Sequence, residues 1–89
     1  MLVWTDGPEL QVWAKPLRGG DRAVALLNRA DTAARITAWL RRTGIRTDSA
    51  RVRDLWKHAD VGTFRGQYAD TVPAHGVRML RLTPVLSSR

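Results

Sequence analysis

The chain has no cysteine among its 89 residues, so neither disulfides nor a thiolate metal site can support its fold. A chain of this length forms one domain with a small core. Its stability must therefore come from side-chain packing and strand pairing. The lack of cysteine does not by itself fix the compartment.

Long hydrophobic runs are also missing. The longest one, residues 23–27, is far shorter than the roughly 20 residues that cross a bilayer. The first residues lack the basic and then apolar pattern of a secretion signal. We therefore expect no transmembrane segment and no signal peptide in this chain, no membrane partner, and we leave its localisation open.

Lysine and aromatic residues are scarce in a chain of formal net charge +7. Only Lys15 and Lys57 accompany 13 arginines, and the chain has one tyrosine and one phenylalanine. Many arginines alternate with apolar residues, as in Arg51-Val52-Arg53, which is typical of a solvated sheet face. Aromatic residues do not interleave with basic ones as in a stacking platform. A basic nucleic-acid-binding β domain thus stays an alternative that the sequence does not favour.

Glycine and proline divide the chain into short alternating segments, with turn signals at intervals of about 8 to 12 residues. This pattern predicts an all-β fold, an antiparallel β-sandwich of about seven strands in two sheets with one short helical turn. The strand at 22–28 is apolar in both phases and should be central. Strands are expected at residues 10–17, 22–28, 34–40, 50–56, 67–72 and 77–83.

The connections follow from turn chemistry. Residues 18–21 predict a tight reversal through glycine, and 40–43 predict the helical turn, ended by Gly44. Residues 57–62 are expected to form a loop, and a bulge near Met79 would reconcile the two apolar phases of the last strand. The expected organisation is an N-terminal connection at 1–9, the β-sandwich accessory domain at 10–84 and a tail at 85–89.

Several short motifs occur in a characteristic order. Val-Trp-Ala-Lys-Pro-Leu at 12–17 is followed by an alanine- and valine-rich strand ending in Asn28-Arg29, then by Arg-Asp-Leu-Trp at 53–56 and Leu-Arg-Leu-Thr-Pro at 80–84. Together they resemble the C-terminal β-sandwich of glycoside hydrolase family 27, the melibiase-type α-galactosidases and α-N-acetylgalactosaminidases. The family's Trp-x-Asp-Leu-Gly-Leu turn is only partly kept, since its aspartate is missing after Trp39.

The resemblance implies a non-catalytic domain that packs on a (β/α)8 catalytic barrel absent from this chain. In that family the acid/base and the nucleophile are two barrel aspartates, and no position here matches them. The resemblance further implies that the full-length protein hydrolyses terminal α-galactosides with retention. No catalytic residue, metal site or cofactor is expected here, and this chain alone is expected not to be an enzyme.

The remaining carboxylates and histidines give no catalytic pattern. Retaining hydrolysis needs two carboxyl groups about 5 Å apart, whereas the carboxylates here lie mostly in turns. His58, Asp60 and His75 lack the spacing of a zinc site, and His75 is expected to bond nearby backbone. Asp70 shares the phase of apolar residues, so it must lie at a rim or pair with an arginine.

The tryptophans are the main candidates for contacts, because an indole ring stacks on sugars and also anchors protein interfaces. Trp56 is expected in the core. Trp13 shares a strand face with Lys15, and its alternatives are core, contact with the barrel and contact with sugar. Candidate residues for carbohydrate or interdomain contact are Trp4, Trp13, Lys15 and Trp39. A free-standing carbohydrate-binding module that uses exposed tryptophans is therefore another alternative.

Overall fold

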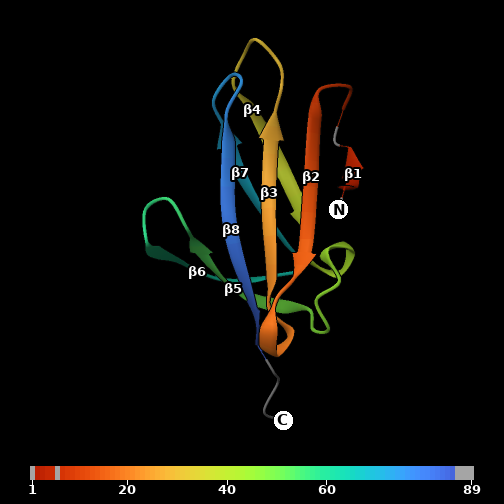
Figure 1. The fold of residues 1–89 in the computed structure, drawn as a ribbon, viewed down its shortest axis with the longest axis vertical. Helices are drawn as coiled ribbons and strands as arrows, with labels where there is room; N and C mark the ends of the chain where they lie inside the picture. Colours follow the sequence, from red (N-terminus) through yellow and green to blue (C-terminus); the bar gives the residue numbers. More distant parts are fainter. Residues whose placement is uncertain (1, 6, 86–89) are drawn as a thin grey trace.

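The fold is that of a computed structural model, which describes the backbone of residues 2–5 and 7–85 and the side chains of residues 5 and 7–85. Within this part the chain is all-β, with short 3-10 turns and no α-helix (Figure 1). The strands are β1 (Leu2–Thr5), β2 (Leu10–Pro16), β3 (Arg22–Asn28), β4 (Ala34–Trp39), β5 (Ser49–Asp54), β6 (Ala59–Arg65), β7 (Gln67–Val72) and β8 (Val77–Pro84). The 3-10 turns are η1 (Arg18–Gly20) and η2 (Leu40–Thr43).

The strands form two antiparallel sheets, which confirms the predicted sandwich. The large sheet has the order β1-β2-β3-β8-β5-β6, and the small sheet pairs β4 with β7. In Figure 1 the small sheet lies behind β2, β3 and β8. As predicted, β3 is interior, because it pairs with β2 on one side and β8 on the other. One face of the large sheet is therefore covered by the small sheet, and the face turned towards the viewer is not.

The core lies between the two sheets and is built from every second residue of their strands, as the alternating pattern requires. The large sheet contributes aliphatic side chains such as Val12 of β2 and Leu26 of β3, both fully buried. The small sheet contributes Ile36 of β4 and Val72 of β7, while Leu40 of η2 closes one end. Val12 and Ala14 therefore face inward, as the sequence predicted.

The two turns that were assigned to glycine are confirmed. Gly19 and Gly20 have φ of 73° and 87° in the reversal between β2 and β3. The 3-10 turn η2 ends at Gly44, whose φ is 93°. Arg22 fixes this end, because its Nε donates to the Thr43 carbonyl (3.1 Å) and its Nη2 to the Gly44 carbonyl (2.9 Å).

Three local expectations were wrong or incomplete. Residues 57–62 are not all loop, because β6 begins at Ala59 and pairs with β5. No bulge occurs at Met79, since β8 pairs with β3 in unbroken register from Val77 to Leu82. The strand expected at 50–56 ends at Asp54, whose Oδ1 accepts from the Trp56 and Lys57 amides (2.9 and 3.0 Å) and starts a turn.

Backbone pairing continues into the two segments that were expected to be a connection and a tail. Residues 1–9, expected as a connection, include β1, which pairs with the outer edge of β2. Val85, the first residue of the expected tail, donates its amide to the Ser49 carbonyl (3.0 Å). The rest of that tail, 86–89, lies outside the described residues.

Candidate functional site

Trp13 and Lys15 lie on β2, on the uncovered face of the large sheet. The Trp13 side chain is 39% exposed, and its Nε1 donates to Gln11 Oε1 (3.0 Å). This bond holds the indole along the strand, beside the neighbouring residues of the same face. Lys15 is exposed one step further along the same face. Neither residue belongs to the core.

The strand register shows which residues lie beside Trp13 on the same face of the large sheet. Trp13 is opposite Ala25 of β3, which is opposite Met79 of β8. The next row pairs Leu27 with Val77, and Leu55, directly after β5, donates its amide to the Met79 carbonyl (2.9 Å). Gln11 of β2 completes the Leu27 row as its polar member. The apolar members on β3, β8 and after β5, namely Ala25, Leu27, Leu55, Val77 and Met79, are all partly exposed.

Trp56 extends this surface, and the expectation that it lies in the core was wrong. Its side chain is 69% exposed. Because Asp54 starts a turn, the indole points away from the sandwich interior. It lines a shallow hollow together with Leu55, His58 and Met79. We call the whole surface the outer apolar patch: Trp13, Ala25, Leu27, Leu55, Trp56, Val77 and Met79.

Sequence reasoning missed most of this patch, although a signal was present. Residues 22–28 and 77–83 are apolar in both strand phases, which we interpreted as a central position and a bulge. The unbroken register instead places Leu80 and Leu82 inside and Val77 and Met79 outside. The second apolar phase marks an uncovered apolar face.

Trp39 lies elsewhere, at the end of β4 in the small sheet. It is 44% exposed, so η2 does not fold back over it as a cover. The ring borders a shallow hollow with Arg41, Arg42, Asp48 and Gly66, in which Arg41 Nε donates to Asp48 Oδ1 (2.6 Å). This group combines an aromatic face with fixed polar groups and is not part of the outer apolar patch.

The fourth candidate, Trp4, has its backbone in β1, in register with Val12 of β2. Its side chain lies outside the described residues. The structure thus brings Trp13 and Lys15 together on one face and places Trp39 on the other sheet.

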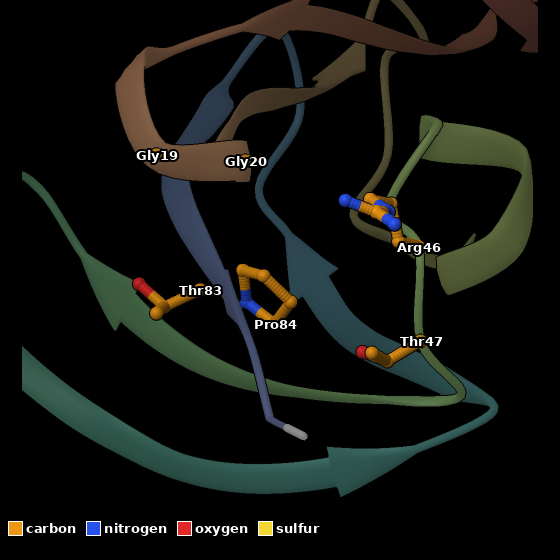
Figure 2. A pocket seen from close by; sticks show the side chains of 6 residues that line it. All are labelled: Gly19, Gly20, Arg46, Thr47, Thr83 and Pro84. Carbon is orange, nitrogen blue, oxygen red and sulfur yellow. The ribbon is translucent and has the colours of Figure 1, made fainter.

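A further hollow lies at the end of the sandwich where β8 leaves the sheet. Gly19 and Gly20 border it on one side, Thr83 and Pro84 on another, and Arg46 and Thr47 on the third (Figure 2). Arg46 brings a guanidinium to its rim. The hollow has no carboxylate or histidine among these residues, so it offers no acid/base pair.

The aspartates that lie near the sheets are held by arginines, hydroxyls or backbone amides. Asp21 Oδ2 accepts from Arg81 Nε (2.7 Å) and from the Thr83 hydroxyl (3.1 Å). Asp70 lies 3.5 Å from Arg78 Nε, which confirms the expected arginine partner. Asp54 is committed to the turn after β5. None of these contacts joins two carboxyl groups.

Tyr68 of β7 has a shifted pKa. Burial, and then the bond that its hydroxyl donates to Asp70 Oδ2 (3.0 Å), raise the pKa of Tyr68 to about 12. Both causes favour the neutral phenol. The hydroxyl is therefore a structural donor at neutral pH.

His75 was expected to bond nearby backbone, but its ring pairs with a side chain. Its Nε2 lies 2.8 Å from Asp31 Oδ1 in an exposed pair, while its backbone amide donates to the Ala30 carbonyl (3.1 Å). Within residues 5 and 7–85, no group of three or more metal-ligating side chains gathers in one place.

This geometry defines a class of protein: a small antiparallel β-sandwich. The aspartates near its sheets form ion pairs and turns, and its exposed tryptophans lie on surfaces that could contact another molecule. Residues 7–82 match the family model described as the alpha galactosidase C-terminal beta sandwich domain. The chain belongs to this family, and the resemblance to glycoside hydrolase family 27 is confirmed.

Known relatives agree with this assignment. The chain is 43% identical over 77 residues to an alpha-galactosidase of Coffea arabica, covering 85% of this chain and 20% of the relative. It is 45% identical over 76 residues to alpha-galactosidase 3 of Arabidopsis thaliana, covering 83% of this chain and 17% of the relative. The chain thus spans about a fifth of the length of the curated relatives it matches.

Solved structures support the same fold. Alpha-galactosidase I from Mortierella vinacea superposes with a TM-score of 0.83 at 33% identity, over 91% of this chain and 22% of that enzyme. A β-L-arabinopyranosidase of family 27 from Geobacillus stearothermophilus has a TM-score of 0.87 at 23% identity, over 99% of this chain and 20% of that one, and so shares the fold. No helix in the described part of the chain is long and apolar enough to span a membrane.

Proposed function

We propose that this chain is a non-catalytic accessory domain that packs on a (β/α)8 catalytic barrel and stabilises it. The observation that carries this proposal is the family match over residues 7–82, together with relatives named alpha-galactosidases that are about five times longer. The full-length protein would hydrolyse terminal α-galactosides with retention, using two barrel carboxylates. The arrangement of carboxylates in the sandwich supports this division of labour, since those near the sheets serve ion pairs and turns.

Two measurements test this role. The coding sequence upstream of this chain should encode a (β/α)8 domain, and the full-length product should release galactose from an α-galactoside. The 89-residue chain assayed alone should give no turnover. Turnover by the isolated chain, or an upstream sequence without a barrel, would refute the proposal.

Trp39 favours a second candidate, carbohydrate binding by the sandwich itself. Its exposed ring lies beside Arg41, Arg42 and Asp48, and an aromatic face next to polar side chains is a suitable sugar contact. Tryptophan fluorescence of the 89-residue chain, titrated with galactose oligomers and galactomannan, tests this candidate. A saturable change that Trp39→Ala abolishes would support it, and no change with either glycan would rule it out.

A further inference from the structure

We propose that the outer apolar patch is the surface by which this domain docks on its catalytic barrel. This inference rests on the proposed function and adds to it which of the two faces of the sandwich is the interface. The patch runs over β2, β3 and β8, on the face turned towards the viewer in Figure 1. Its centre is the row Trp13, Ala25 and Met79.

The two outer faces of the sandwich differ in chemistry. The outer face of the small sheet carries Arg35 opposite Thr71 and Trp39 opposite Gln67, so a polar or charged group is present in both of these rows. On the large sheet, the row Trp13, Ala25 and Met79 is apolar throughout, and the row of Gln11, Leu27 and Val77 is polar only at its β2 end. A contiguous apolar surface with a polar rim is typical of a protein interaction site. The large sheet is therefore the face that needs a partner.

A polar row borders the patch on one side, as at the rim of protein interfaces. Lys15 is opposite Ala23, which is opposite Arg81 of β8, so a row with two cations adjoins the apolar rows. The guanidinium of Arg81 is held by Asp21. Trp13 is likewise held by Gln11, and rigid aromatic side chains with their rotamers fixed in advance lose little entropy on docking.

The partner is best supplied by the same polypeptide. The curated relatives are about five times longer than this chain, so most of such a protein lies outside the sandwich. The edge strand β1 pairs with β2, and Leu2 is opposite Trp13. A barrel that precedes β1 would therefore connect to the sandwich at the β2 edge of the patch.

Matched substitutions in the full-length protein test the docking face. Trp13→Arg and Met79→Arg place a charge in the patch, and Gln67→Arg places the same charge on the exposed face of β7. We expect the first two to shorten the half-life of α-galactosidase activity at elevated temperature by about tenfold or more, as loss of a central interface anchor does. Gln67→Arg is the control, and both its half-life at elevated temperature and its initial activity at 25 °C should stay within about twofold of the wild type.

Radical footprinting gives a readout that needs no substitution. Oxidation of Trp13 and Met79 should be several-fold slower in the full-length protein than in the 89-residue chain, while oxidation of Trp39 should be equal in both. Equal oxidation of Trp13 in both proteins, with an active full-length enzyme, would overturn the docking face but leave the proposed function intact. Concentration-dependent protection of Trp13 in the 89-residue chain would instead identify a second copy as the occupant and overturn the inference.

Discussion

The side-chain amide of Asn28, at the end of β3, donates to the backbone carbonyl of Val72, at the end of β7, across 3.0 Å. This bond joins the large sheet to the small one. The same amide nitrogen also lies 2.9 Å from the Thr32 carbonyl and 3.2 Å from the Pro73 carbonyl, and its Oδ1 accepts from the Ala30 amide (2.8 Å). One fully buried polar side chain therefore fixes the two loops at this end of the sandwich.

Removing the Asn28 side-chain amide should lower the free energy of unfolding. Asn28→Ala leaves the buried Val72 carbonyl without its donor and should lower the free energy of unfolding by about 1 to 3 kcal/mol. Asn28→Asp should be worse at neutral pH, because a carboxylate would face the same carbonyl oxygens. Urea unfolding followed by tryptophan fluorescence measures both. An aspartate variant as stable as the wild type would contradict this account of the Asn28 contacts.

Tyr68 should titrate about two units above an ordinary tyrosine. It is the only tyrosine in the chain, so tyrosinate absorbance reports it alone. We expect a pKa of about 12 in the folded chain against about 10 in denaturant. The folded state then holds the proton more tightly, so this contribution to stability is complete below pH 10 and is lost as pH rises towards 12. In Asp70→Asn the pKa should fall but remain above 10, because burial is the larger cause.

Gly44→Ala should be more damaging than Gly19→Ala. Both glycines have left-handed φ, which costs a non-glycine residue about 1 to 2 kcal/mol. A Cβ at Gly44 would also approach Arg22 Nε to 2.9 Å, whereas a Cβ at Gly19 meets nothing within 4 Å. The extra loss at Gly44 reports the displaced Arg22 bonds, and it should shrink when both alanines are compared in an Arg22→Ala background. Equal losses in the wild-type background would exclude this role of Arg22.

The inner half of the fold could be predicted because local pattern and tertiary structure agree there. Val12, Leu26 and Ile36 alternate with outward residues, and glycine marks the reversals on either side of β3. The sequence did not predict β6, and the reason is physical. Its residues are mostly exposed, with Gly62 in its middle, so it has no apolar phase to detect. Its position comes from pairing with β5, which is information distant in sequence.

The candidate site was only partly predictable, for a related reason. Trp13 and Lys15 were placed on the correct face by alternation alone. Met79 and Leu55 were not, because an apolar residue in the second phase of a strand has the same sequence signature whether it meets a core, a bulge or another domain. Register across β2, β3 and β8 resolves this ambiguity.

Trp56 and Leu26 provide the sharpest comparison of sequence and structure. The sequence predicted Trp56 in the core, yet Trp56 is 69% exposed, whereas Leu26 of the central strand β3 is fully buried. In the 89-residue chain, Trp56→Ala should change the free energy of unfolding by less than about 0.5 kcal/mol, as is usual for exposed positions. Leu26→Ala should cost about 2 to 5 kcal/mol, because it opens a cavity between the sheets. Chemical denaturation of the two variants measures both values. A loss at Trp56 as large as that at Leu26 would mean that the indole packs in the core and does not belong to the outer apolar patch.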